Sequence, residues 1–153
     1  FSLGLAWKGL DFSVLFQGAA NTTLKIGGNF RKPFDQNGGP IMEHSFDAWS
    51  PDNKAAARYP RLSVSHSQAQ NYYTSDIWLK DASYLRFKNA ELGYTINFRK
   101  LKFISSCRLF VNAQNIYVWD KLEGIVDPEN KTDNNGINYP QQRVFNLGVN
   151  LKF

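Results

Sequence analysis

The sequence contains a single cysteine, Cys107, and only two histidines, His44 and His66. One cysteine excludes an internal disulfide and a cysteine-rich zinc site. The histidines have no neighbouring cysteine, and the HExxH pattern of zinc proteases is missing. The sequence also lacks a recognisable grouping of serine, histidine and aspartate. We therefore expect no metal, no cofactor and no enzymatic activity.

Long apolar runs and clusters of one charge are missing too. No stretch of about 18 apolar residues is present, so no helix is expected to span a bilayer. A transmembrane β-strand needs only about 9–11 alternating residues, so a membrane barrel is still possible. The formal net charge is +5, but the lysines and arginines are scattered along the chain. This distribution indicates a mixed solvated surface and no nucleic-acid partner.

Aromatic residues are abundant, at 15% of the chain, and they occur in short alternating runs. The clearest run closes the sequence, where every second residue is large and apolar: Phe145, Leu147, Val149, Leu151 and Phe153. Asparagine, glycine and lysine lie between them. This period of two predicts a β-strand with one apolar and one polar face.

Alternation of this kind predicts five strands, at residues 1–7, 10–18, 84–98, 107–119 and 143–153. Lys8 and Gly9 form the expected tight hairpin turn between the first two strands. Residues of about 19–83 and 120–142 are rich in turn-forming residues and are predicted to be long loops. Within the first loop, we expect residues 22–30 to extend the preceding strand and residues 61–66 to form a short strand.

Two architectures fit this alternation. A soluble sandwich packs its apolar faces against each other, whereas a large membrane barrel turns them outward to lipid and encloses its polar face. Short and long connections alternate along the chain, and aromatic residues flank the strands, namely Trp7, Tyr94, Phe98, Tyr117 and Trp119. Both features favour the barrel, because aromatic girdles mark membrane interfaces. A soluble all-β carbohydrate-binding module is the alternative.

Three stretches carry a more specific pattern. They read FDAWSPDNKAAARYPRL (46–62), SDIWLKDASYLRFKNAELGYTI (75–96), and LEGIVDPE (122–129) with NYPQQRVFNLGVNLKF (138–153). Together they resemble the C-terminal end of the SusC/RagA family of TonB-dependent outer-membrane transporters from Bacteroidetes. The resemblance covers the chain from about residue 46 onward, and the first 45 residues match only as generic barrel strands.

The resemblance implies an all-β fold in which residues 1–153 form the antiparallel C-terminal strands of a large transmembrane β-barrel. Such a barrel has about 22 strands around a plug, so this chain alone would not close it. The plug domain and the earlier strands are expected to be absent from this sequence. The protein would be integral to a Gram-negative outer membrane. The loops at about 19–83 and 120–142 would be extracellular.

The same resemblance implies roles for the final strand. An outer-membrane barrel closes by pairing its last strand with its first, which leaves no edge in lipid. Five side chains would face lipid: Phe145, Leu147, Val149, Leu151 and Phe153. The terminal aromatic, Phe153, would also belong to the signal read by the barrel-assembly machinery.

The function implied is import of oligosaccharides or peptides with energy from TonB. The partners would be the remaining barrel and plug, a SusD-like surface lipoprotein, and TonB through the missing N-terminal part. Four loop aromatics are candidate ligand contacts, because aromatic faces stack on sugars and peptides: Trp49, Tyr72, Tyr73 and Tyr139. Packing within the loop is the other interpretation of each of these residues.

Overall fold

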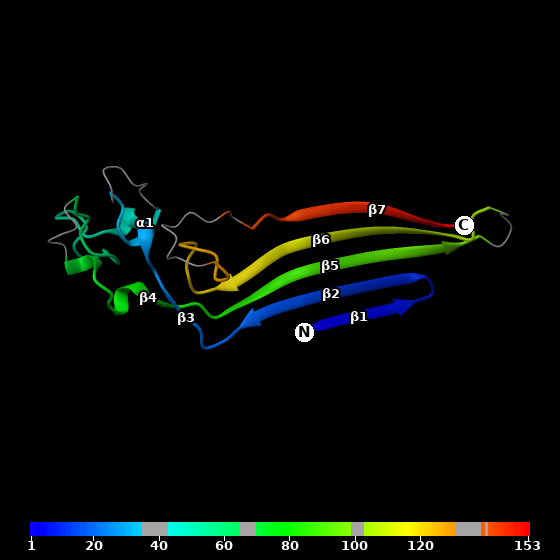
Figure 1. The fold of residues 1–153 in the computed structure, drawn as a ribbon, viewed down its shortest axis with the longest axis horizontal. Helices are drawn as coiled ribbons and strands as arrows, with labels where there is room; N and C mark the ends of the chain where they lie inside the picture. Colours follow the sequence, from blue (N-terminus) through cyan, green and yellow to red (C-terminus); the bar gives the residue numbers. More distant parts are fainter. Residues whose placement is uncertain (35–42, 65–69, 99–102, 131–138, 140) are drawn as a thin grey trace. The chain divides into compact units, whose positions relative to one another are not determined.

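The computed structural model describes residues 1–34, 43–64, 70–98, 103–130, 139 and 141–153. The chain divides into two compact units, which are shown with the strand order in Figure 1. We call the first the sheet unit, comprising Phe1–Ala19, Tyr84–Trp119 and Gln141–Phe153. The second, the loop unit, comprises Ala20–Ser83 and Asp120–Pro140.

The sheet unit is a single five-stranded sheet in the order β1-β2-β5-β6-β7. The pairs β1–β2, β2–β5 and β6–β7 are antiparallel. The strands are β1 Ser2–Trp7, β2 Leu10–Ala19, β5 Tyr84–Asn97, β6 Ser106–Asp120 and β7 Val144–Lys152. All five predicted strands are confirmed with nearly their predicted bounds, because alternating side chains report strand geometry directly. In the connection between β5 and β6, residues 99–102 lie outside the described residues.

The hairpin turn between β1 and β2 is the one that the sequence predicts. Lys8 and Gly9 both have positive φ angles, of 46° and 90°. Two consecutive left-handed residues fit the twist of antiparallel strands. The backbone of Thr95 in β5 also approaches closely, since its N–H donates to the Gly9 carbonyl at 2.7 Å. A Cβ on residue 9 would lie 2.7 Å from the Thr95 carbonyl oxygen, so glycine is required there.

An irregularity in β5 explains why its apolar positions change from odd to even residue numbers. Leu15 of β2 pairs with Asn89, but the next residue, Phe16, pairs with Phe87. One extra residue, Lys88, therefore lies in β5 between these two pairs, as in a β-bulge. The bulge puts Phe87 on the same face as Leu92, although one number is odd and the other even. It also allows Phe16 to stack on Phe87, with 4.7 Å between ring centroids.

The loop unit contains short elements only. Strand β3 (Thr23–Lys25) pairs with β4 (Leu79–Asp81) in a separate two-stranded sheet. The helical turns are α1 Gly28–Arg31 and the 3₁₀ helices Glu43–Asp47, Gln70–Tyr72 and Asp76–Trp78. No helix among the described residues is long and apolar enough to cross a membrane.

Two predictions for the first long segment are wrong. Residues 22–30 do not continue β2, because β3 turns away to pair with β4, a strand more than fifty residues later. Residues 61–64 form no strand, and residues 65 and 66 lie outside the described part. Both predictions used local alternation, which carries no information about a partner distant in sequence.

The hydrophobic core lies in the loop unit. Its members are Ile26, Phe30, Ala48, Tyr59, Trp78, Ala82, Leu122 and Val126, each with at most 9% of its surface exposed. The first six come from the first long segment and the last two come from the second. The two predicted loops therefore share one core, which gives them an organisation that their turn-rich sequence did not indicate.

Candidate functional site on the two faces of the sheet

The strand register sorts the side chains of the sheet unit into an apolar and a polar face. Directly opposite residues share a face, so Trp7, Leu10 and Tyr94 form one row across β1, β2 and β5. At the other edge of the sheet, β6 and β7 add the pairs Leu109–Val149, Val111–Leu147 and Ala113–Phe145. The apolar face thus extends over all five strands.

This apolar face is exposed. Leu147 has 80% of its surface exposed, Phe145 72% and Leu5 62%. The predicted final-strand set continues the pattern, with Val149, Leu151 and Phe153 also exposed. Water-soluble monomers seldom expose a contiguous apolar face of this extent. A soluble sandwich would bury these side chains against a second sheet, and the described residues provide no such layer.

Aromatic side chains gather at both ends of the sheet. Trp7 and Tyr94 lie in the row next to the Lys8–Gly9 turn. Tyr117 and Trp119 lie at the opposite end, near the C-terminus of β6, with 4.8 Å between their ring centroids in an edge-to-face arrangement. The band between the two aromatic rows is mostly aliphatic and includes Phe12, which lies between Leu5 and Leu92.

An ion-pair network connects three strands on the polar face. Arg108 of β6 donates from Nε to Asp11 of β2 at 3.0 Å and from a terminal nitrogen to Glu91 of β5 at 2.6 Å. A second hydrogen bond to Asp11 completes a bidentate contact. The three side chains are partly buried. Bidentate arginine–carboxylate contacts are stronger and geometrically more specific than single ones.

Gly93 makes this network possible. It lies on β5 directly opposite Asp11, between the strands that carry Asp11 and Arg108. A Cβ at position 93 would lie 2.4–2.7 Å from three guanidinium atoms of Arg108. The guanidinium therefore lies flat on the β5 backbone, which is how it reaches a carboxylate two strands away.

Replacing Gly93 with valine is expected to displace Arg108 and leave Asp11 and Glu91 without their shared cation. We expect a lower unfolding temperature, because the bidentate contact with Asp11 and the hydrogen bond to Glu91 are lost together. Thermal unfolding of the purified protein in detergent measures it. Arg108→Met removes the same contacts without a clash, so the double variant should be no less stable than Gly93→Val alone. Strictly additive losses would contradict this explanation.

The network continues along β6 toward β7. The Arg108 guanidinium lies 5.0 Å from the centroid of the Phe110 ring, within the range of a cation–π contact. The Phe110 ring in turn covers Gly148 of β7, where a Cβ would clash with it. Asn146 donates to Asn112 at 2.8 Å across the same two strands. Charged, aromatic and amide groups therefore share the polar face of β6 and β7.

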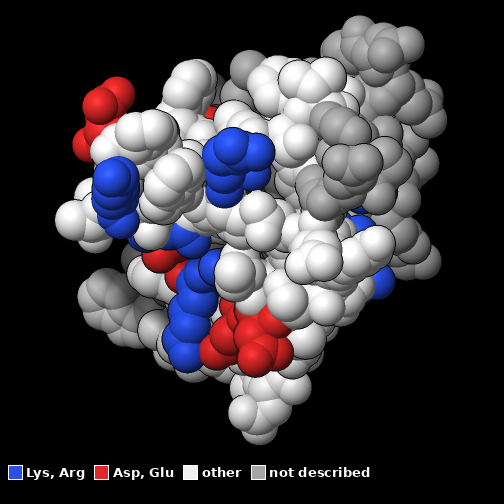
Figure 2. All heavy atoms as spheres, turned by 90° about the vertical axis from the view of Figure 1, so that its left-hand side faces the viewer, with Lys and Arg blue, Asp and Glu red and all other residues white. Residues whose placement is uncertain are grey.

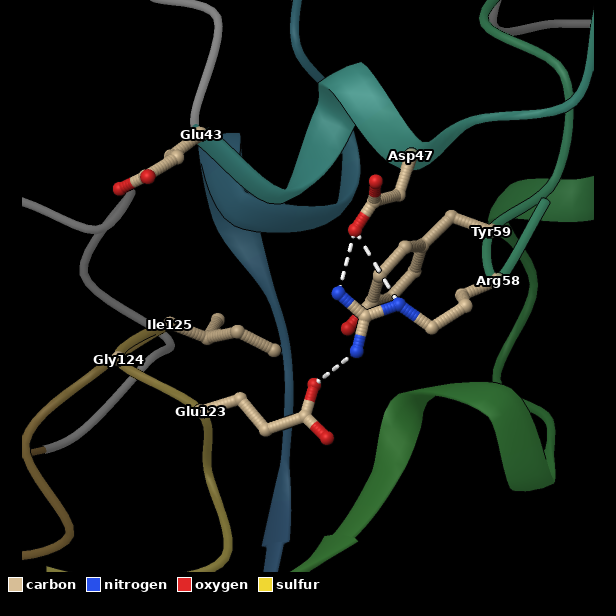
Figure 3. Close-up of a pocket in the computed structure, with 7 residues that line it drawn as sticks. All are labelled: Glu43, Asp47, Arg58, Tyr59, Glu123, Gly124 and Ile125. Atoms are coloured by element: carbon tan, nitrogen blue, oxygen red, sulfur yellow. Dashed lines mark hydrogen bonds and ion pairs between the residues drawn. The ribbon is translucent and has the colours of Figure 1, made fainter. Parts of the chain in front are cut away.

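The loop unit contains a cavity of about 320 Å³, shown in Figure 3. Arg58 points into it between Asp47 and Glu123, and its hydrogen bond with Glu123 measures 2.6 Å. The hydrogen bonds that Arg58 donates to Asp47 raise the pKa of Arg58, and burial raises the pKa of Tyr59, which also lines the cavity. The arginine is fully engaged with carboxylates, which is typical of a structural ion pair.

The surface of the molecule carries both charge signs. Figure 2 shows a face on which lysine and arginine side chains lie among aspartate and glutamate side chains, separated by larger uncharged areas. Among the described residues, no three histidine, cysteine, aspartate or glutamate side chains are placed to hold a metal ion.

The four predicted ligand contacts lie in different environments. Tyr139 is 80% exposed, Tyr73 68% and Trp49 39%. Tyr72 is 4% exposed, and its hydroxyl accepts a hydrogen bond from the Ser63 N–H at 2.8 Å. Tyr72 therefore packs inside the loop unit, and none of the four lines the cavity of Figure 3.

Comparisons with known proteins agree with the resemblance found in the sequence. No family model matches the chain. TonB-dependent receptor P3 of Formosa agariphila is 28% identical over the whole chain, which covers 16% of that receptor. TonB-dependent receptor SusC of Bacteroides thetaiotaomicron is 34% identical over 55% of the chain and 9% of its own length.

Solved structures give the same result for the fold. The RagAB peptide importer in its open-open state superposes with a TM-score of 0.69 at 27% identity, over 99% of this chain and 16% of that one. Its closed-closed state gives a TM-score of 0.72 at 23% identity, again over 99% of this chain and 16% of that one. At this level of identity, the match supports the similarity of fold only. The chain spans about one sixth of the length of TonB-dependent receptor P3 and of the RagAB chains. The predicted resemblance is thereby confirmed: the chain is similar to TonB-dependent receptors, including SusC, and its sheet matches part of a RagAB structure, a β-barrel that five strands do not close.

Proposed function

We propose that this chain is part of the wall of an outer-membrane importer that takes up nutrients with energy from TonB. The observation that carries the proposal is the exposed apolar face, which extends across five strands and lies opposite a polar face. Transmembrane β-barrels have this arrangement, with apolar side chains toward lipid and polar ones toward the interior. The names of the similar receptors and of the RagAB importer support it.

In this orientation, the apolar residues of the final strand contact lipid, namely Phe145, Leu147, Val149, Leu151 and Phe153. The Arg108 network faces the barrel interior, where water and neighbouring polar groups solvate its charges. The two aromatic rows lie at the two membrane interfaces, with the aliphatic band between them in hydrocarbon. Phe153 contributes to the signal that the barrel-assembly machinery reads.

The short Lys8–Gly9 turn and the connection between β5 and β6 lie in the periplasm, because outer-membrane barrels have short periplasmic turns and longer external loops. The loop unit is then extracellular. The remaining barrel strands and the plug are supplied by the rest of the receptor, and its N-terminal part engages TonB.

The substrates we propose are peptides or oligosaccharides too large for passive diffusion, delivered with a SusD-like surface lipoprotein as partner. The peptide class is supported by the RagAB importer, to which this chain is similar. The exposed aromatics Trp49, Tyr73 and Tyr139 suit either class, because their faces stack on sugar rings and on peptide side chains.

Fractionation and uptake assays test the proposal. The receptor that contains this chain should remain in the outer-membrane fraction after a carbonate wash and should require detergent for extraction. Cells expressing it should accumulate labelled peptide or oligosaccharide, and deletion of TonB should abolish that uptake while leaving the receptor in the membrane. A chain that is monodisperse in plain buffer, without membrane association, would overturn the proposal and favour a soluble module.

A further inference from the structure

Two buried side chains attach the second long segment to the first, and Leu122 is the more deeply buried of them. Leu122 is fully buried, with none of its surface exposed, and belongs to the core that contains Ile26 and Trp78. Val126, at 9% exposure, is the other member that the second segment contributes. The segment that follows β6 therefore inserts an apolar anchor among residues that lie between about 40 and 100 positions earlier in the sequence.

An ion pair flanks this anchor on each side. Lys121 Nζ lies 2.8 Å from Asp81 Oδ2, at the end of β4. Glu123 Oε2 lies 2.6 Å from a terminal nitrogen of Arg58, and Arg58 also contacts Asp47. The hydrogen bond from Lys121 lowers the pKa of Asp81, so the carboxylate is charged over the whole physiological range. Three consecutive residues thus contact three separate parts of the first segment.

The backbone of the second segment is shaped for this contact. The Leu122 N–H donates to the Asp120 side chain at 2.8 Å, and the Ile125 N–H donates to the Leu122 carbonyl at 3.0 Å. Between these bonds, Glu123 and Gly124 have φ angles of 53° and 78°. Two successive left-handed residues closed by a hydrogen bond between the first and fourth residues form a tight turn, in which glycine takes the positive φ without strain. The turn places Leu122 and Glu123 side by side at the first segment.

The cavity of Figure 3 lies where the two segments meet. Asp47, Arg58 and Tyr59 line it from the first segment, and Glu123, Gly124 and Ile125 line it from the second. The contact between the two segments is therefore interrupted by this cavity, and a few side-chain contacts hold the segments together. Exposed ion pairs contribute little, so Leu122 is the contact on which closure mainly depends.

We propose that residues 120–126 form a clasp that joins the two long segments into one cooperative body, so that a displacement of either segment is transmitted to the other. When the clasp is closed, Leu122 occupies the shared core. The ion pairs of Lys121 and Glu123 on either side orient the Leu122 side chain toward that core. When it opens, the first segment loses part of its core and its protection from solvent, although its own residues are unchanged. The clasp does not depend on the nature of the transported substrate.

Hydrogen exchange in the intact receptor tests the clasp. The readouts are two amides of the first segment: Ile26 N–H, bonded to the Trp78 carbonyl, and Ala82 N–H, bonded to the Thr22 carbonyl. Leu122→Ala should accelerate their exchange on the order of a hundredfold, because deleting a buried leucine removes transfer energy and leaves a cavity. The control Val64→Ala, at a side chain of the first segment that is 78% exposed, should leave both rates unchanged. Faster exchange confined to residues 120–126 would overturn the proposal.

Gly124→Ala is a second variant for the case in which Leu122→Ala fails to assemble. No atom lies within 4 Å of the position that its Cβ would occupy, so the change acts only through the left-handed backbone. We expect about tenfold faster exchange at Ile26 and Ala82. Unchanged rates would contradict the clasp. Both readouts are measured without transport, so they can fail or succeed independently of the import function.

Discussion

Leu147→Arg should lower the stability of the receptor in a membrane by about 2–4 kcal/mol, the cost of an arginine near the middle of a lipid-facing strand. Leu147 lies at the centre of β7, and 80% of its surface is exposed on the apolar face. In water, a charge at so exposed a site would cost almost nothing. The size of the effect therefore reports the solvent that this face contacts.

The neighbouring residue on the opposite face provides the matched control. Asn146→Arg places the same charge one position away, on the side that we assign to the aqueous interior, and it loses one exposed hydrogen bond to Asn112. That loss is about 1 kcal/mol. Chemical unfolding of the receptor in lipid vesicles measures both variants, and immunoblots of outer-membrane fractions measure their assembly. Equal effects of the two arginines, or a larger effect of Asn146→Arg, would exclude the proposed orientation.

The sheet unit could be predicted almost completely from the sequence. A strand repeats every two residues, so runs such as Phe145 to Phe153 specify both the element and its faces without any knowledge of the partners. The bulge at Lys88 could be inferred only in part. The apolar positions of β5 change from odd to even around it, but the register with Leu15 and Phe16 was needed to show which strand holds the extra residue.

The polar network and the loop unit required the structure. Asp11, Glu91 and Arg108 were each assignable to a polar face, but their meeting depends on which strands are neighbours and on the space above Gly93. The core of the loop unit has no periodicity to detect. Its members are isolated apolar residues in turn-rich sequence, and contacts between residues as distant as Ile26 and Leu122 are set by tertiary packing alone.

Trp78→Ala should destabilise the loop unit by about 3–5 kcal/mol, the usual cost of removing a buried large aromatic side chain. Trp78 is 3% exposed, its indole N–H donates to the Asn71 carbonyl at 2.8 Å, and its ring lies 6.0 Å from that of Tyr59. It also ends a 3₁₀ helix directly before β4, and its carbonyl accepts the Ile26 N–H. One substitution therefore removes the largest core side chain and loosens the β3–β4 pair.

The matched control for this variant is Tyr73→Ala, which deletes an aromatic side chain of the same unit that is 68% exposed and should cost less than about 1 kcal/mol. Limited proteolysis of the receptor in lipid vesicles distinguishes them, because a destabilised loop unit is cleaved within Ala20–Ser83 at lower protease concentration. The strands of the sheet unit should stay protected, since none of their side chains belongs to the core cluster. Cleavage of the strands at the same protease concentration would mean that the sheet depends on the loop core, and the loop unit would then be part of the barrel wall rather than a separately stabilised body.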